Sequence, residues 1–460
     1  MVEESEKLPE NEVKKFPDDF VFGVGASSDQ NEGNRDRTRH NDWDGYFARH
    51  PEKNLVQPGE IGPDWWTPGQ AEQDFERIAN LGIEAQRFGV EWARIQPEPG
   101  VISQEALKRY RNMVDFLKEK GIDPMITLNH FTLPDWIAKQ GGWANKSTVD
   151  AFRYYSEVMA DTFGDVARWI TINEPGNVVS LGYLTGDWPP EKKLSPKAFL
   201  AQNNIVRANS AAYDVLKRQI PESQVGMTNY VMWYKPEDPN SRMDRFVAEK
   251  ANSFFNDSFP NKTQDDTDFL GVDFYTGFLM KFNPTSFGVS MRDDAQGVVK
   301  NIPFGETVRP EPADYQSDMG WPIVPDYFLE ALQHMHNTFH KPVVITENGL
   351  ADRDDNFRAF YILTHLAALH EAIESGVDIK GYYHWTTVDN KELMEGFKYN
   401  FGLIGLDART QERTIRQSAK MYGEIAQSHE IDVNKLAQEY LTEEQRARAE
   451  QIIEGFKTTL

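Results

Sequence analysis

The segment Val343-Val344-Ile345-Thr346-Glu347-Asn348-Gly349 is the clearest structural signal in the sequence. Its three consecutive β-branched residues predict a strand buried on both faces, because the run is too short for a helix. The Asn-Gly pair that follows is typical of a tight turn. Glu347 therefore lies at the end of a buried strand, where a carboxylate costs desolvation free energy unless a neighbouring group interacts with it.

Short apolar runs of this kind recur along the chain and alternate with segments of helical periodicity. We expect a turn and a short strand within 16–28, and strands at 85–92, 124–128, 166–172, 224–230, 268–275, 342–347 and 379–385. We expect helices at 66–81, 104–120, 148–163, 197–218, 243–256, 325–339, 357–375 and 416–427. Because alternating strands and helices build parallel sheets, these eight units predict an α/β fold, a single (β/α)8 TIM barrel.

The sequence has no Gly/Ser-rich stretch that would separate two domains. Residues 1–15 are charged and predict a flexible N-terminal arm, and residues 16–430 form the predicted barrel domain. Residues 276–320 are rich in Gly, Pro, Asp and Asn and predict a long loop insertion after the sixth strand. Residues 431–460 predict a helical extension, which either packs on the barrel or forms a contact in a homo-oligomer.

The composition argues against several classes of function. Acidic residues outnumber Lys and Arg by 72 to 49, and the net charge of −23 disfavours nucleic acids and anionic membranes as partners. The chain of 460 residues has no cysteine, which excludes disulfide bonds, thiol nucleophiles and thiolate metal sites. The N-terminus has no apolar run resembling a signal peptide, and no window approaches the ~18 to 20 apolar residues of a membrane span. We therefore expect a cytoplasmic protein.

In a barrel of this kind, functional residues lie at the C-terminal ends of the strands. The residues expected at these ends are polar or aromatic, whereas the strand interiors are apolar. A random selection of loop residues would consist mainly of Lys, Glu, Ser and Gly. The strand-end residues are Gln30, Arg87, Glu91, His130, Asn173, Glu174, Asp273, Tyr275, Glu347 and Trp385.

Glu174 and Glu347 each follow a β-branched run, at the ends of the predicted fourth and seventh strands. Two carboxyl groups at one barrel mouth suit glycoside cleavage, in which one protonates the leaving oxygen and the other attacks or activates water. A separation of ~5–5.5 Å gives retention through a covalent intermediate, and ~6.5–9.5 Å gives inversion. The sequence leaves both outcomes open.

Two motifs carry a resemblance to a known family. The segments Thr171-Ile172-Asn173-Glu174-Pro175 and Ile345-Thr346-Glu347-Asn348-Gly349 resemble the acid/base and nucleophile motifs of glycoside hydrolase family 1, the β-glucosidase family. Further segments resemble the same family in the same order, so that the resemblance covers nearly the whole chain. These segments are 16–33, 87–97, 129–136, 141–143, 268–276, 319–325 and 381–407.

The resemblance implies a retaining β-glycosidase that acts without a cofactor or metal on the non-reducing end of small β-glycosides or oligosaccharides. β-Glucosides are the first expected substrates, with β-galactosides and β-fucosides next and β-mannosides after them. It makes Glu174 the general acid/base and Glu347 the nucleophile, with Arg87 and Tyr275 in contact with the nucleophile. It also implies a set of residues that bind the sugar: Gln30, His130, Phe131, Asn173, Trp321, Trp385 and Glu392.

The chain departs from the family pattern at several positions of the expected sugar site. The usual Asn-Phe-Glu-Trp is Asn390-Lys391-Glu392-Leu393 here, and Leu393 lacks the indole N–H that the family offers to a sugar hydroxyl. The glycone preference at that edge is therefore left open. Asp273 replaces a frequent Asn beside the nucleophile, where a second carboxylate tends to raise pKa values unless it is paired. Glu392 would repel a phosphate, so phosphorylated sugars are not expected.

Two other functions are consistent with part of this pattern. An endo-acting glycan hydrolase of another barrel family would use the same two carboxylates, but the run of family motifs argues against it. A non-catalytic carbohydrate-binding relative typically lacks one of the glutamates, and this chain has both. The half-match to a dinucleotide motif at 23–28 and the pair His336 and His340 are weaker signals, from which we expect neither a nucleotide cofactor nor a metal site.

Overall fold

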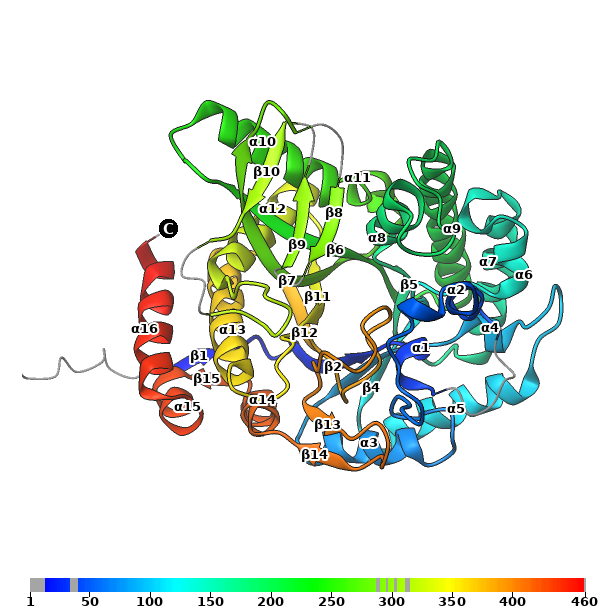
Figure 1. Cartoon of the computed structure of the whole chain (residues 1–460). Helices are drawn as coiled ribbons and strands as arrows, with labels where there is room; N and C mark the ends of the chain where they lie inside the picture. The colour runs from blue at the N-terminus through cyan, green and yellow to red at the C-terminus, as the bar shows by residue number, and fades with distance from the viewer. Residues whose placement is uncertain are drawn as a thin grey trace, which may run out of the picture.

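The computed structural model describes residues 13–33, 40–286, 290–294, 297–301, 304–310 and 315–458 (Figure 1). Eight parallel strands form a closed ring, because each strand pairs with the next and the eighth pairs with the first. In order around the ring, they are β2 (Val21–Ala26), β3 (Ala85–Gly89), β4 (Asp123–Asn129), β5 (Arg168–Asn173), β6 (Gln224–Pro236), β7 (Phe269–Phe282), β11 (Val343–Asn348) and β12 (Ile379–Trp385).

Helices surround this ring and alternate with its strands (Figure 1). The longer ones are α3 (Gln70–Asn80), α5 (Gln104–Glu119), α7 (Ser147–Thr162), α9 (Lys197–Gln219), α10 (Arg242–Phe255), α12 (Pro325–Phe339), α13 (Arg358–Glu374) and α14 (Gln417–Ser428). The shorter ones are α1 (Ser28–Asn31), α2 (Asp42–Arg49), α4 (Trp92–Ile95), α6 (Asp135–Lys139), α8 (Pro175–Val179), α11 (Pro260–Thr263), η1 (Pro51–Lys53), η2 (Gly142–Ala144), η3 (Ser180–Thr185) and η4 (Gln264–Asp266).

Helix α5 illustrates why the sequence forms these elements. Ser103 caps its N-terminus, where the side-chain oxygen accepts a hydrogen bond of 3.2 Å from the backbone N–H of Ala106. Its apolar residues recur every three or four positions and are buried, so one face packs against the core: Ala106, Leu107, Tyr110, Met113, Val114 and Leu117. Gly121 follows the helix with a φ of 73°, a left-handed conformation that glycine adopts without a Cβ penalty.

The interior of the ring is filled by side chains. Six residues from six different ring strands form a separate buried cluster: Ala85, Met125, Ile170, Phe269, Val344 and Tyr383. Because successive side chains of a strand point to opposite faces, Arg87 and Thr127 lie on the same face as Ala85 and Met125, one step nearer the C-terminal ends. The inward face therefore changes from apolar to polar towards those ends.

The predicted loop insertion at 276–320 is wrong for much of its length. Strand β7 continues to Phe282, and β10 (Gly305–Val308) pairs with it in antiparallel register. Strands β8 (Ser290–Asp294) and β9 (Gly297–Asn301) also form an antiparallel pair, on the side of the ring where α10 lies (Figure 1). The remaining parts of the insertion at 287–289, 295–296, 302–303 and 311–314 lie outside the described residues.

The predicted flexible arm is wrong for its last three residues. β1 (Val13–Lys15) pairs in antiparallel register with β15 (Glu430–Asp432), so a short sheet joins the start of the chain to the expected boundary near 430. The buried Lys14 also forms an ion pair of 3.8 Å with Glu371 of α13. Residues 1–12 of the predicted arm lie outside the described residues.

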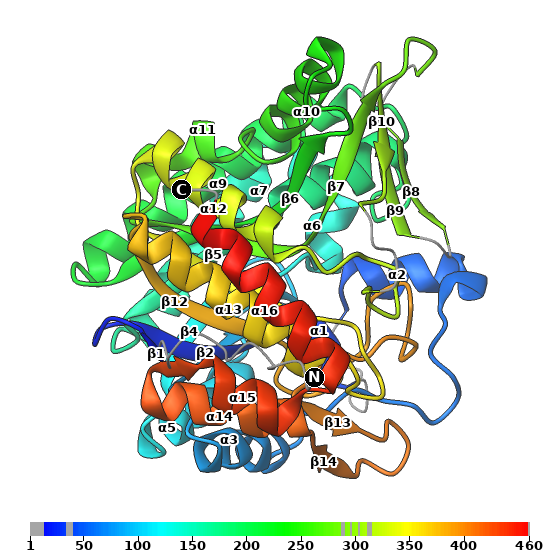
Figure 2. The ribbon, with the colours of Figure 1, turned by 90° about the vertical axis from the view of Figure 1, so that its left-hand side faces the viewer.

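The C-terminal segment forms the predicted helices, α15 (Val433–Tyr440) and α16 (Glu443–Thr458). Helix α16 lies along α13, as Figure 2 shows, and buries Ala449, Ile453 and Phe456. The segment packs on the main domain through α13, and the expectation of a homo-oligomer contact stays a prediction. A further antiparallel pair, β13 (Ile404–Leu406) and β14 (Arg413–Ile415), follows β12. Among the described residues, no helix has both the length and the apolar character needed to cross a membrane.

Candidate active site

The predicted site residues lie on the ring strands or just after their C-terminal ends, with one exception. Trp321 lies between β10 and α12, and its ring packs edge-on against that of Tyr275 at 5.9 Å between centroids. Arg87 and Tyr275 lie within β3 and β7. The others end or follow β2, β4, β5, β11 and β12: Gln30, His130, Phe131, Asn173, Glu174, Glu347, Trp385 and Glu392.

The two glutamates lie close together in space. One carboxylate oxygen of Glu174, one of Glu347 and one of Asp273 all lie within 4.8 Å of one another. Glu174 and Glu347 are only 5% and 3% exposed, so their mutual interaction is poorly screened by water. This spacing fits the ~5–5.5 Å of a nucleophile and an acid/base, and it is shorter than the ~6.5–9.5 Å that leaves room for an attacking water.

Irregular strand pairing directs both glutamate side chains into the ring mouth. The register of β5 against β6 shifts between Ile170 and Asn173, and that of β11 against β7 shifts between Ile345 and Glu347. Such irregularities change the direction of the side chains that follow them. Glu174 itself has a φ of 41°, a strained conformation for a residue with a Cβ, and strain of this kind is often found at functional sites.

Both carboxylate oxygens of Glu347 accept strong hydrogen bonds. Nη1 of Arg87 donates to Oε1 at 2.6 Å, and the hydroxyl of Tyr275 donates to Oε2 at 2.6 Å. Burial raises the pKa of Glu347, and the charge of Arg87 and the hydroxyl of Tyr275 oppose that rise. These two contacts hold the carboxylate in one orientation and favour its charged form.

Glu174 has a different environment from Glu347. Its Oε2 accepts one hydrogen bond of 2.6 Å from Nδ2 of Asn177. Burial, together with the negative charge of Glu347, raises the pKa of Glu174 to about 8. At neutral pH Glu174 is therefore protonated. The guanidinium that would favour its charged form, that of Arg87, donates its hydrogen bond to Glu347. The two carboxyl groups are thus suited to opposite roles, one as an acid and the other as an anion.

Asp273 is a third carboxyl group at this point, which the strand-end pattern included but the expected site residues did not. It lies on β7 beside Glu347 in the strand register, is fully buried, and accepts a hydrogen bond of 2.7 Å from the hydroxyl of Thr346. Burial and the charge of Glu347 raise the pKa of Asp273 well above its usual range. Three carboxylates are a donor set that hard divalent cations prefer, but the Arg87 guanidinium already places a positive charge against them.

The expected sugar-binding residues form connected pairs around the glutamates. Asn173 accepts a hydrogen bond from Nη2 of Arg87, and its Nδ2 lies 3.3 Å from Nε2 of His130. The ring of His130 stacks on that of Trp385 at 5.7 Å between centroids. Burial, reinforced by the charge of Arg87, holds the pKa of His130 well below its usual range, so its imidazole is neutral.

Gln30 and Glu392 form a second pair, in which Nε2 of Gln30 donates to Oε2 of Glu392 at 3.2 Å. Burial and the charge of Glu347 raise the pKa of Glu392 to about 8. Phe131 has a φ of 70° and packs edge-on against Trp188 at 4.9 Å between ring centroids. The side chains of both pairs and of Trp385 therefore combine hydrogen-bonding groups with aromatic faces, as sugar sites do.

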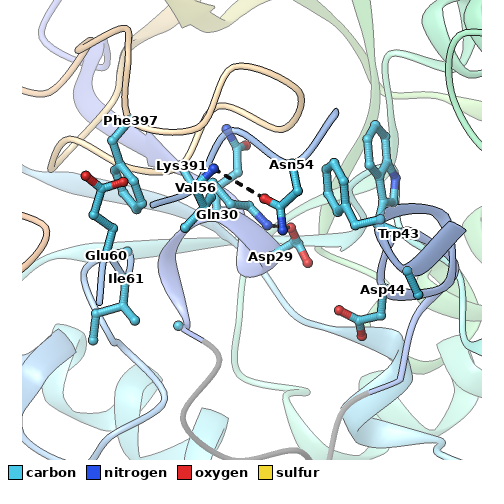
Figure 3. Close-up of a pocket in the computed structure, with 14 residues that line it drawn as sticks. Asp29, Gln30, Trp43, Asp44, Asn54, Val56, Glu60, Ile61, Lys391 and Phe397 are labelled. Carbon is cyan, nitrogen blue, oxygen red and sulfur yellow. Dashed lines mark hydrogen bonds and ion pairs between the residues drawn. The ribbon is translucent and has the colours of Figure 1, made fainter. Parts of the chain in front are cut away.

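Lys391, a departure from the family motif, lies on the wall of a neighbouring pocket of about 350 Å³ (Figure 3). Its Nζ forms an ion pair of 2.8 Å with Asp29, which also accepts a hydrogen bond of 3.0 Å from Asn41. The pocket adjoins the expected sugar site through Gln30, while Glu174 and Glu347 are not among its lining residues. These are Asp29, Gln30, Gly33, Trp43, Asp44, Phe47, Ala48, Asn54, Val56, Glu60, Ile61, Gly62, Lys391 and Phe397.

Comparison with known proteins relates this geometry to a family. The family model described as "Glycosyl hydrolase family 1" matches residues 12–264 and 255–431. Beta-glucosidase A of Thermotoga maritima is 31% identical and the match covers 91% of this chain and 99% of that protein. A beta-galactosidase of Pyrococcus woesei is 30% identical over 93% of this chain and 99% of that protein.

A solved structure, the beta-glycosidase from Pyrococcus horikoshii, superposes with a TM-score of 0.82. It is 34% identical, and the match covers 94% of this chain and 99% of that one. The family and this structural neighbour imply that the closed ring of strands is a (β/α)8 barrel. The expected resemblance is therefore confirmed, and the chain belongs to glycosyl hydrolase family 1 and is a glycoside hydrolase.

Proposed function

We propose that the protein is a retaining β-glycosidase that removes the terminal non-reducing sugar from small β-glycosides, with β-glucosides as its main substrates. The observation that carries this proposal is the pair of buried carboxyl groups whose oxygens lie within 4.8 Å of each other. Their environments differ, because Glu347 is held by Arg87 and Tyr275, whereas Glu174 has a pKa of about 8.

In the first step Glu347 attacks the anomeric carbon of the sugar and the bond to the leaving oxygen breaks. Glu174 gives its proton to that oxygen, so that an alcohol and not an alkoxide departs. The product is a glycosyl ester on Glu347, with the sugar inverted at the anomeric carbon. Arg87 and Tyr275 then lose part of their interaction with Glu347, because its negative charge is neutralised in the ester.

In the second step Glu174, now a carboxylate, removes a proton from a water molecule. The water oxygen attacks the anomeric carbon, the ester bond breaks, and Glu347 leaves as a carboxylate. Two inversions restore the original configuration, and both carboxyl groups return to their starting protonation states. The positive charge of Arg87 favours the departing carboxylate of Glu347 at 2.6 Å.

The substrate class follows from the groups around this pair. Asn173, His130, Gln30 and Glu392 offer donors and acceptors to the hydroxyl groups of one sugar, and Trp385 offers an aromatic face. The names of the relatives support both β-glucosides and β-galactosides as substrates. Lys391 and Leu393 replace apolar and aromatic family residues at the far edge, so this edge would decide between sugars that differ at one hydroxyl.

The experiment that tests the assignment is azide rescue of Glu347→Ala with 2,4-dinitrophenyl β-glucoside. We expect hydrolysis to be nearly abolished while the variant stays folded, and added azide to give the α-glycosyl azide, because the small anion enters the space of the missing carboxylate. The exposed Glu98→Ala is the matched control and should keep wild-type rates. Formation of the β-azide would show that Glu347 is not the nucleophile. Rapid cleavage of a long glucan with poor activity on aryl glycosides would favour the endo-acting alternative.

A further inference from the structure

Asp273 lies in the active site, but the two-carboxylate mechanism gives it no role. It is on β7 two residues before Tyr275, so both side chains point to the same face of the strand. In the strand register Asp273 lies beside Glu347 on one side and Tyr230 on the other. Its carboxyl group is 0% exposed and lies within 4.8 Å of the carboxyl groups of Glu174 and Glu347.

The two oxygens of Asp273 have unequal surroundings. The Thr346 hydroxyl donates to Oδ1 at 2.7 Å, and that hydroxyl in turn accepts a hydrogen bond of 3.1 Å from the hydroxyl of Thr228. Oδ2 is buried and has no hydrogen-bond partner among the residues that the structure describes. A buried carboxylate oxygen without a donor is costly, because it loses its hydration and gains no hydrogen bond in return.

Arg87 does not supply the missing donor. Its Nη1 lies 4.0 Å from Oδ1 of Asp273, which is beyond hydrogen-bond distance, and that nitrogen already donates to Oε1 of Glu347 and to the backbone oxygen of Thr346. Arg87 therefore donates to Glu347 directly, and its charge acts on Asp273 only from 4.0 Å, where it opposes the rise in the pKa of Asp273 without satisfying Oδ2. The charged and titratable groups that face Asp273 are Arg87 from β3, Glu174 after β5, Tyr230 from β6, Tyr275 from its own strand and Glu347 from β11.

A proton on Oδ2 removes the cost of a buried carboxylate oxygen without a donor. A neutral carboxyl group has an O–H that can itself donate to a neighbouring carboxyl oxygen. We propose that Asp273 acts as a neutral carboxylic acid that donates a hydrogen bond to Glu174 and thereby supports proton transfer from Glu174 to the leaving group. Asp273 is then a positioning residue, because it acts through Glu174 and does not contact the reacting atoms. The proposal rests on the acid/base role of Glu174 in the proposed function.

The chemical consequence follows from the proton balance. When Glu174 gives its proton to the leaving oxygen, it becomes a carboxylate, and the proton on Asp273 stays in place and stabilises that new charge by a charge-assisted hydrogen bond. An ionised Asp273 has the opposite effect, since it accepts the proton of Glu174 in a hydrogen bond and keeps it from the substrate. Burial and the nearby carboxylates raise the pKa of Asp273, which agrees with a neutral side chain at neutral pH.

The test compares Asp273→Asn with Asp273→Leu. Asn keeps a donor in nearly the same place and cannot titrate, whereas Leu has a similarly branched side chain and no donor. With aryl β-glucosides we expect the Asn variant to stay within about threefold of the wild type in kcat/KM at the optimum pH. The Leu variant should lose about 10-fold or more. This loss should be larger for alkyl glucosides than for 2,4-dinitrophenyl glucoside, whose departure needs little help from an acid.

The alkaline side of the pH profile of kcat/KM gives the sign of the effect. If Asp273 must be neutral, the alkaline limb of the Asn variant lies at the same pH as that of the wild type, where Glu174 loses its proton, or at higher pH where Asp273 ionises first. If Asp273 is ionised in the active enzyme, removing its charge lowers the pKa of Glu174 and shifts the alkaline limb to lower pH, which overturns the proposal. An Asn variant as impaired as the Leu variant overturns it as well.

A second measurement does not depend on turnover. The infrared difference spectrum between the wild type and Asp273→Asn at neutral pH should contain the C=O band of a protonated carboxyl group, and a carboxylate band alone would contradict the proposal. The outcomes also separate the two claims. A wild type that hydrolyses no aryl β-glycoside removes the proposed function and this inference together. An active wild type whose difference spectrum contains a carboxylate band alone removes only the inference.

Discussion

The contact between Tyr275 and Glu347 gives a prediction whose size can be derived from the structure. Tyr275→Phe removes one hydroxyl, which donates to Oε2 of Glu347 at 2.6 Å, and keeps the ring that packs on Trp321 at 5.9 Å and on Tyr230 at 6.2 Å. The variant should therefore fold. A hydrogen bond to a charged group contributes about 1.5–3 kcal/mol, and about 1.36 kcal/mol corresponds to one pKa unit.

The hydroxyl of Tyr275 stabilises the carboxylate form of Glu347 and not its acid form, so its loss raises the pKa of Glu347. The acid limb of kcat/KM should move to higher pH by about 1–2 units. Arg87 still donates to Oε1, so the nucleophile keeps one of its two contacts and activity is reduced but not abolished. At the optimum pH we expect a loss of about 10- to 100-fold, since Glu347 is also held less firmly.

The assay measures kcat/KM for an aryl β-glucoside across the acid range, with the wild type and Tyr154→Phe as references. Tyr154 is an exposed tyrosine of α7, and its variant controls for the change of residue type. An acid limb that stays in place, or that moves to lower pH, would refute the idea that Tyr275 keeps Glu347 ionised. If Tyr275→Phe melts at a clearly lower temperature than Tyr154→Phe, the hydroxyl of Tyr275 has a structural role instead.

Two further predictions concern the acid/base residue and the short sheet at the chain ends. Glu174→Ala should keep most of its kcat/KM on 2,4-dinitrophenyl glucoside and lose about 10²- to 10⁴-fold on alkyl glucosides, because only poor leaving groups need protonation; equal losses on both substrates would remove the acid role. Deleting residues 1–15 removes β1 and the ion pair of Lys14 with Glu371, and should lower the free energy of unfolding in urea by about 1–3 kcal/mol relative to a chain that lacks only residues 1–12. Two deletions of equal stability would show that β1 contributes nothing.

Much of the fold could be predicted because its signals are local. Each ring strand is a short apolar run and most long helices have a periodic apolar face, so their order along the chain indicates the architecture. The insertion was less predictable, because its Gly, Pro, Asp and Asn residues are typical of loops. Its strand β7 nevertheless extends to Phe282, where it pairs with β10, a strand that begins more than 20 residues later in the chain. The pairing of β1 with β15 joins residues 13–15 to residues 430–432 and has no local signal at all.

The order of strands and helices, the family resemblance and the polar residues expected at the strand ends could all be derived from the sequence, because residue type and periodicity are local properties of the chain. The distance of at most 4.8 Å between carboxyl oxygens of Glu174 and Glu347, and the donors to both oxygens of Glu347, are visible only in the folded chain. The fold also brings a third carboxyl group, Asp273, within 4.8 Å of both, and its Oδ2 has no hydrogen-bond partner among the described residues. The physical reason is that pKa values and hydrogen bonds depend on distance and burial, and these arise from strands far apart in the sequence that meet at one end of a closed ring.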